Sequence, residues 1–129
     1  MWGLTPITIM EQDFKITIDK KDKYDILNLS GNLDTYVVND LKYTIESAFS
    51  SDRYNLILDL GKVNNINSTA LGILVGRLHK ATEHKGEIVL TNLNVYIRKV
   101  FDMVGAGRLF SIFEDVKDAE DYFIKKLNK

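Results

Sequence analysis

The apolar run Leu56–Leu60 is the feature that most constrains the fold of this chain. Its sequence, Leu-Ile-Leu-Asp-Leu, is short and almost continuously apolar. Such a run is typical of a strand that is covered on both faces, as in a parallel sheet. We predict a strand over Tyr54–Leu60. Asn64, Asn65 and Asn67 follow it, and their turn-forming side chains predict that the strand has ended there.

A helix is predicted directly after this turn, from about Ser68 to Ala81. Ser68 stands where a helix needs a side-chain acceptor for its free backbone N–H groups, so we expect it to cap the helix. At 100° per residue, the helix has an apolar side, expected to face the sheet, that consists of Ala70, Leu71, Leu74, Val75 and Leu78. The other side consists of Ser68, Thr69, Gly72, Gly76 and Lys80.

Gly72 and Gly76 each cost about 1 kcal/mol of helix stability relative to alanine when no packing compensates. One interpretation is that they keep the surface beside Ser68 clear for another molecule. The other is that they receive a neighbouring loop or helix of the same chain. Ser68 also has two interpretations, because a serine at a helix start is either a cap or a place where a phosphate group is electrostatically favoured.

The remaining segments alternate between strand and helix patterns. Further strands are expected at Phe14–Ile18, Tyr24–Leu33, Glu87–Leu90 and Ser111–Phe113. The helical spacing of Val38, Leu41, Ile45 and Phe49 predicts a helix. Asp34 or Thr35 is placed to cap its start.

Two more helices complete the pattern. The first, over Val95–Val104, is expected to end at Gly105 and Gly107 and to bury Ile97, Val100, Phe101 and Val104. The second, capped by Asp115, is expected to bury Val116, Ala119, Phe123 and Leu127. The order β-β-α-β-α-β-α-β-α predicts an α/β domain over residues 13–127, with a mostly parallel, mixed sheet of about five strands and about four helices. Residues 1–12 are expected to form an arm or an extra strand.

Composition excludes several classes of protein. The formal net charge is −1, which provides no basic surface for nucleic acid, and cysteine is absent. No apolar run is long enough to span a bilayer, and the first twelve residues do not resemble a signal peptide, so we expect a cytoplasmic protein without membrane insertion. His79 and His84 lack neighbouring acids at metal-ligand spacing, and no nucleophile motif is present. We therefore expect no enzyme site, metal or cofactor.

Four separated segments carry a resemblance to a known family. They are Gly31–Asp34, Leu56–Leu60 together with Asn67–Gly72, Val100–Phe110 and Phe113–Ala119. In order and spacing they resemble the STAS domain family, and within it the stand-alone anti-sigma factor antagonists of bacteria. The similarity covers roughly residues 13–125.

The resemblance implies a partner switch. In this family, the dephosphorylated antagonist binds an anti-sigma factor that is also a serine kinase, the kinase phosphorylates the serine matching Ser68, and a phosphatase restores the binding form. Thr69 is the lesser candidate for phosphorylation. The residues expected to contact the partner are Asp34, Asn67, Ser68, Thr69, Gly72, Ile73, Gly76 and Lys80.

Two positions depart from the family pattern, because Asn67 replaces an acid and Ala70 replaces a glycine. Asn67 favours an alternative, a non-phosphorylated STAS module in a signalling scaffold or a lipid-transport complex. A further alternative is a small nucleotide-binding protein, since α/β sheets bind ligands at the carboxyl ends of their strands. The oligomeric state is left open by the sequence.

Overall fold

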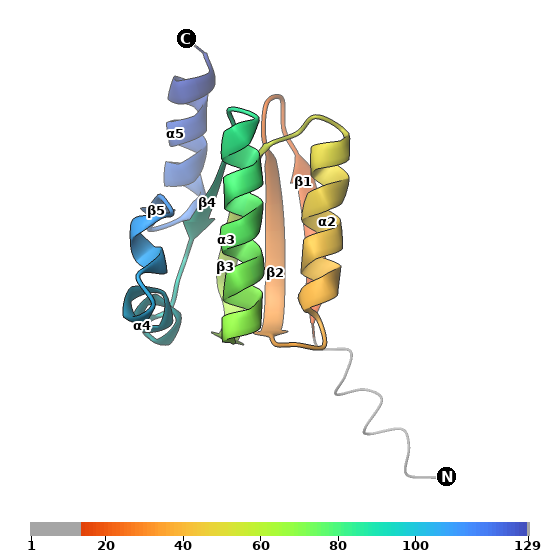
Figure 1. The fold of residues 1–129 in the computed structure, drawn as a ribbon. Helices are drawn as coiled ribbons and strands as arrows, with labels where there is room; N and C mark the ends of the chain where they lie inside the picture. Colours follow the sequence, from red (N-terminus) through yellow and green to blue (C-terminus); the bar gives the residue numbers. More distant parts are fainter. Residues whose placement is uncertain (1–13, 129) are drawn as a thin grey trace, which may run out of the picture.

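The computed structural model describes residues 14–128, which form a five-stranded mixed sheet with helices on both faces (Figure 1). The strands are β1 (Lys15–Lys20), β2 (Asp25–Leu33), β3 (Asn55–Ile66), β4 (Glu87–Thr91) and β5 (Ile112–Phe113). The helical elements are α2 (Val38–Ser50), α3 (Ser68–Glu83), α4 (Val95–Met103), the 3-10 turn η1 (Ala106–Arg108) and α5 (Val116–Leu127). The predicted α/β fold and element order are confirmed. The predicted arm at residues 1–12 lies outside the described residues.

The sheet keeps the order of the chain, β1-β2-β3-β4-β5. β1 runs antiparallel to β2, whereas all other neighbouring strands are parallel. Parallel neighbours need a crossover connection, and α2, α3 and α4 supply these connections. The carboxyl ends of β2, β3 and β4 therefore lie at one edge of the sheet, together with the starts of the helices that follow them.

β3 is longer than predicted. Asn64 and Asn65 continue the strand instead of ending it, and the strand stops only at Ile66. The reason is its partner β2, which continues alongside and pairs Leu33 with Ile66 after two shifts of register. Val63 and Ile66 are buried, so the added length contributes to the core. Strand pairing and burial thus override the turn preference of the asparagines.

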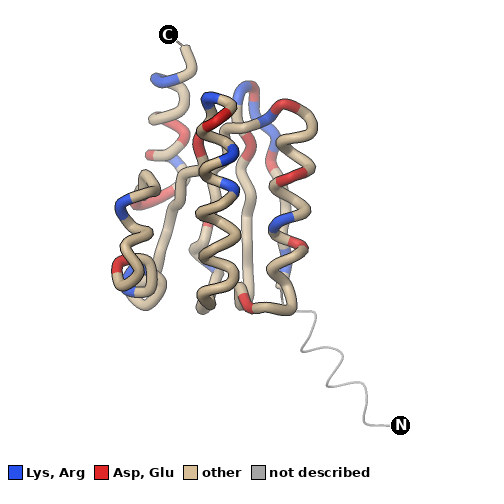
Figure 2. The backbone as a smooth tube through the Cα atoms, in the orientation of Figure 1, with Lys and Arg blue, Asp and Glu red and all other residues tan. Residues whose placement is uncertain are grey.

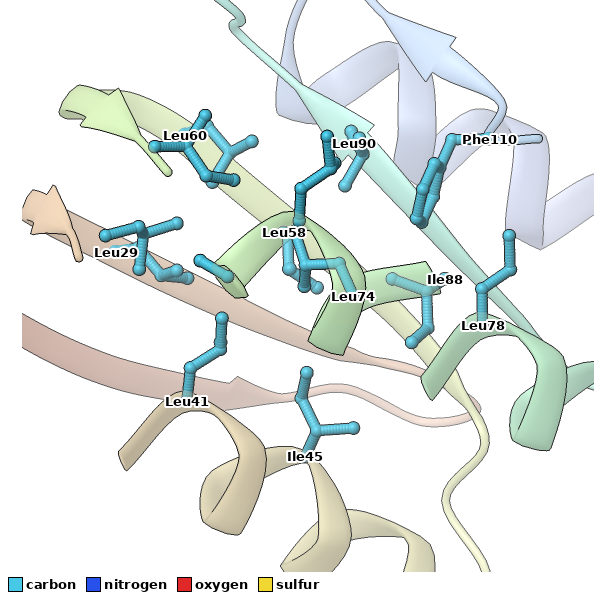
Figure 3. Packing of buried hydrophobic residues seen from close by; sticks show 14 of the residues in the cluster. Leu29, Leu41, Ile45, Leu58, Leu60, Leu74, Leu78, Ile88, Leu90 and Phe110 are labelled. Atoms are coloured by element: carbon cyan, nitrogen blue, oxygen red, sulfur yellow. The ribbon is translucent and has the colours of Figure 1, made fainter. Parts of the chain in front are cut away.

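Alternate residues of the central strands point to opposite faces of the sheet, and each face has its own core. The larger core lies beneath α2, α3 and α4, and Figure 3 shows Leu41 and Ile45 of α2 and Leu74 of α3 within it. The smaller core lies beneath α5 and consists of Tyr24, Ile26, Ile57, Val89, Ala119 and Phe123. The prediction that the strand through Leu56–Leu60 is covered on both faces is confirmed.

The first helix of the prediction, α2, is confirmed, and all four of its predicted core residues are buried. Its predicted cap is wrong. The capping position is held by Val37, and no side chain accepts a hydrogen bond there. Asp34 instead accepts a hydrogen bond from the N–H of Tyr36 at 2.9 Å, and Thr35 lies in the same loop. Three further residues separate Asp34 from the helix, so its carboxylate stabilises the loop and does not cap the helix.

The buried sides of α3 and α4 differ in detail from the prediction. In α3, Val75 is half-buried, whereas the other predicted core residues are buried. In α4, Val100 is only half-buried, and Val104 is 61% exposed because the helix has already ended at Met103. Gly105 follows with the left-handed φ of 76° that favours glycine after a helix. Gly107 is not a helix stop, since it lies within η1.

The predicted cap of α5 is confirmed, because Asp115 accepts a hydrogen bond from the N–H of Asp118 at 2.9 Å. The predicted core side of this helix is only partly correct. Ala119 and Phe123 are buried, but Val116 and Leu127 are half-buried. These two residues are the first and last of the helix, and they pack against the smaller core without being enclosed by it.

Glu87 fastens α5 to the sheet. Its carboxylate accepts hydrogen bonds from the Tyr122 hydroxyl at 2.6 Å, the Lys126 Nζ at 2.6 Å and the Ser111 hydroxyl at 2.8 Å. Burial by itself raises the pKa of Glu87, but the hydrogen bonds from Lys126, Tyr122 and Ser111 outweigh burial and hold that pKa below its ordinary value. Burial likewise opposes the charge on Lys126, yet the Glu87 carboxylate raises the pKa of Lys126 overall.

We expect Glu87→Gln to lower the free energy of unfolding at pH 7 by about 1–2 kcal/mol, because Lys126 loses its charged acceptor. A carboxylate whose pKa is lowered by folding stabilises the protein above its unfolded pKa of about 4.3, and this contribution is lost as the pH falls through the folded pKa. Glu87→Gln is therefore expected to lose less stability than the unsubstituted chain between pH 7 and pH 3. Urea unfolding at both pH values measures this, with the exposed Glu83→Gln as control. Equal pH dependence in all three chains would contradict it.

Candidate partner-binding site

The start of α3 is capped by Asn67, so the prediction that Ser68 caps it is wrong. Asn67 is extended, with φ −99° and ψ 172°, and its Oδ1 accepts a hydrogen bond from the N–H of Ala70 at 2.9 Å. A capping side chain belongs to the last residue before the helical turns. Because β3 keeps the chain extended as far as Ile66, this role falls to Asn67 and Ser68 becomes the first helical residue.

This arrangement leaves the Ser68 side chain accessible. Ser68 and Thr69 are exposed, and the Ser68 hydroxyl makes no hydrogen bond to any residue between 14 and 128. The sequence from Ile66 to Gly76 contains no Asp, Glu, Lys or Arg, and Figure 2 shows the first half of α3 without charged residues. The hydroxyl therefore stands on an uncharged surface at the positive end of the helix dipole.

Gly72 and Gly76 face open space. A methyl group built on either of them would meet no atom within 4 Å apart from nearby helix backbone. Within the part of the chain that the structure describes, the interpretation that they receive a loop or helix of the same chain is therefore wrong. The open face of α3 is defined here as Ser68, Thr69, Gly72 and Gly76.

The side of α3 toward α2 is closed by ion pairs. Glu46 of α2 pairs with Arg77 and with Lys80, whose Nζ lies 3.0 Å from the Glu46 Oε1. Helical spacing places Lys80 on the same side of the helix as Ser68 and the two glycines, but in the structure its ammonium group lies against α2. Ile73 is half-buried and packs against the main core. Both residues therefore border the open face rather than form it.

The loop between β2 and α2 lies beside the start of α3. The Asn67 N–H donates to the Leu33 carbonyl at 3.0 Å, and the Asn67 Nδ2 donates to the Thr35 Oγ1, also at 3.0 Å. Asp34, which is half-buried, follows Leu33 directly. The structure thus brings together two predicted segments, Asp34 and the turn around Ser68, that lie more than thirty residues apart in sequence.

Sequence reasoning missed Tyr36, which is 93% exposed in this same loop. The signal that could have revealed it is an aromatic residue two positions after Asp34, outside the apolar pattern of the following helix. Asp34, Asn67 and the open face of α3 lie together with Tyr36 at the carboxyl edge of β2 and β3.

We also considered other parts of the surface as candidate sites. A polar depression of about 330 Å³ lies beside Gly61 of β3 and the ends of β4 and β5, with Asn92, Arg98 and Glu114 in its lining. Residues 14–128 contain no group of three His, Cys, Asp or Glu side chains placed to hold a metal ion. His79 and His84 are exposed as predicted, and the His84 ring stacks on Tyr54. None of the described helices has the length and hydropathy needed to cross a membrane.

Because Asn67 caps α3, we expect Asn67→Ala to lower the free energy of unfolding by about 1 kcal/mol. Ser68→Ala is expected to change it by no more than a few tenths, since the hydroxyl satisfies no backbone group. Urea unfolding of the two variants measures the difference. A cost for Ser68→Ala equal to that for Asn67→Ala would show that the serine shares the capping role.

Gly72→Ala is expected to raise the free energy of unfolding by about 0.5–1 kcal/mol, because alanine favours a helix and the added methyl group meets nothing. Gly86→Ala is the matched control and is expected to be strongly destabilising, since its Cβ would collide with the Tyr54 carbonyl oxygen. Thermal and urea unfolding measure both variants. Destabilisation by Gly72→Ala would mean that the open face is covered in the folded chain.

Known proteins share this architecture. Residues 15–119 match the family model described as STAS domain. The anti-sigma-B factor antagonist of Staphylococcus epidermidis is 26% identical over 98 residues, which cover 76% of this chain and 90% of that protein.

Two solved structures of SpoIIAA have the same fold. The anti-sigma factor antagonist SpoIIAA in its unphosphorylated form has a TM-score of 0.76 at 20% identity, covering 86% of this chain and 97% of that one. The Bacillus cell fate determinant SpoIIAA in the phosphorylated form has a TM-score of 0.67 at 22% identity, covering 84% and 98%. The family match spans most of the sequence, from β1 into α5. The chain belongs to the STAS domain family.

Proposed function

We propose that this chain is an anti-sigma factor antagonist that binds an anti-sigma factor through the open face of α3 and the neighbouring Asp34 loop. We further propose that the anti-sigma factor is a serine kinase, and that phosphorylation of Ser68 switches the binding off. The name of the staphylococcal relative and the two forms of SpoIIAA support this proposal.

The observation that carries the proposal is that Asn67, and not Ser68, caps α3. Asn67 supplies the helix cap, so the Ser68 hydroxyl is free and exposed beside an uncharged surface. A kinase can modify such a hydroxyl without removing a hydrogen bond that the helix needs. Because Gly72 and Gly76 have no side chains, a partner could approach the backbone of α3 closely at this surface. The two glycines lower helix stability, and no packing within the described chain compensates for this loss.

A phosphate at Ser68 would change the surface far more than the fold. It carries about two negative charges at pH 7, and the N–H groups and dipole at the start of α3 favour that charge. An interface formed on the open face would have to desolvate the same charges, and any acidic group of the partner would repel them. Phosphorylation is therefore expected to oppose docking while leaving the chain folded.

Asn67 modifies this switch without removing it. A carboxylate at this position would place a negative charge next to the Ser68 phosphate, whereas the amide does not. The loss of that charge also removes a group that could orient the kinase. The rate of phosphorylation is therefore the property most sensitive to this residue.

The test uses each anti-sigma factor kinase encoded in the same genome, purified separately and incubated with the chain and ATP. We expect one added phosphate by intact mass, its loss in Ser68→Ala, and its retention in the matched control Thr69→Ala. Calorimetry is expected to show binding by the unmodified chain and at least tenfold weaker binding by the phosphorylated chain and by Ser68→Asp.

Two results would contradict parts of this proposal. Phosphate on another residue would refute the role of Ser68. Binding to an anti-sigma factor with no phosphate transfer would favour the alternative of a non-phosphorylated STAS interaction module. A chain that binds none of the anti-sigma factors would refute the proposed function as a whole.

A further inference from the structure

We propose that Tyr36 is an anchor residue for the anti-sigma factor that docks at Ser68, and that Thr35 and Asn67 position it. This inference rests on the proposed function and adds a contact residue from a different element. It also gives Asn67 a second role. Its amide donates a hydrogen bond to Thr35, which an ionised carboxylate at this position could not do.

The loop that carries Tyr36 is held by hydrogen bonds at both ends. The Tyr36 N–H donates to the Asp34 Oδ1 at 2.9 Å, and the Val37 N–H donates to the Asp34 carbonyl at 3.2 Å. Leu33, just before the loop, accepts the N–H of Asn67 and is paired in the sheet. The backbone at Tyr36 is therefore fixed in place before any partner arrives.

The Asn67 side chain joins this loop to α3. Its Oδ1 accepts from the Ala70 N–H, while its Nδ2 donates to the Thr35 Oγ1 at 3.0 Å. One planar amide therefore holds the helix start and the loop in a fixed relation. A carboxylate has no proton to donate, so it would meet Thr35 only if the Thr35 hydroxyl turned round to act as the donor.

Tyr36 is 93% exposed, so its ring is almost fully accessible to a partner. Tyrosines are enriched among the residues that contribute most to protein interfaces, because a large ring is buried at a low cost in side-chain entropy. A ring presented on a fixed loop costs still less to order on binding. Thr35, its neighbour in the chain, is bonded to Asn67 at the start of α3, so the loop that carries the ring adjoins the open face and we expect one partner to contact both.

The partner chemistry follows from these groups. The open face is uncharged and contains two glycines, and the loop adds an aromatic ring with a hydroxyl group. A fitting anti-sigma factor surface would place an apolar element along α3 and an apolar pocket around the Tyr36 ring. A polar rim would meet the Tyr36 hydroxyl and the Asp34 carboxylate.

Tyr43 provides a matched control. It is also a highly exposed tyrosine, at 76%, but it lies with Phe14 and Ile16 on the β1 side of α2. The α3 side of the same helix carries Glu46. Removing the Tyr43 ring therefore takes away a similar area far from the Asn67–Thr35 hydrogen bond.

The first measurement is calorimetric titration with the purified anti-sigma factor that binds the unsubstituted chain. Tyr36→Ala is expected to weaken binding about tenfold or more, Tyr36→Phe to retain most of the affinity, and Tyr43→Ala to change it less than about twofold. Melting temperatures of all three variants are expected to match that of the parent chain. Unchanged affinity in Tyr36→Ala would overturn the inference.

The second measurement tests positioning by a double-mutant cycle. Thr35→Val removes the acceptor for the Asn67 amide and is expected to weaken binding in the parent chain but to add little in Tyr36→Ala. Thr35→Ser keeps the hydroxyl and is expected to bind like the parent. A full additional loss from Thr35→Val in the Tyr36→Ala chain would show that Thr35 does not act through the ring.

Gly72→Arg separates failure of this inference from failure of the proposed function. If Gly72→Arg abolishes binding while Tyr36→Ala has no effect, the proposed function stands and the anchor role of Tyr36 is refuted. If the unsubstituted chain binds none of the anti-sigma factors tested, the proposed function and this inference are both refuted.

Discussion

The extended pairing of β2 with β3 is the constraint on which the site depends. The two strands remain parallel neighbours as far as Leu33 and Ile66, beyond the apolar run that forms the centre of the sheet. The loop after β2 and the helix start after β3 therefore emerge side by side. Asn67 then links them through one amide, whose two ends make two different hydrogen bonds. Without the longer strand, the cap would fall at a different residue and the loop would lose its neighbour.

The residues that stabilise the molecule are separate from its proposed binding surface. Apolar side chains fill both faces of the sheet, and Glu87 fixes α5 through two donors of that helix, Tyr122 and Lys126, on the far side from α3. The open face of α3 contributes nothing comparable, since its glycines leave space unfilled. A phosphate or a charged side chain can therefore alter the surface with little effect on the core. This separation is a physical requirement for a switch that changes binding and not folding.

Much of the fold could be predicted because its main elements are governed by local patterns. The run Leu56–Leu60 and the helical spacing of the α2 core residues led to correct elements, and Asp115 was the correct cap of α5. The errors fall where a neighbour in space decides. Asn64 and Asn65 extend a strand because β2 pairs with it, and Lys80 turns toward α2 because Glu46 is there.

The sequence by itself determined the α/β order, the double-sided sheet and the presence of an uncharged serine-and-glycine segment at a helix start. These features follow from the periodicity and composition of short segments, so they can be predicted without knowledge of which segments contact one another in the fold. Only the tertiary structure decided that Asn67 caps the helix, that the glycines face open space and that the loop carrying Tyr36 is bonded to Asn67 through Thr35. These depend on hydrogen bonds and empty volume between segments some thirty residues apart, and no local pattern of residues encodes such distances.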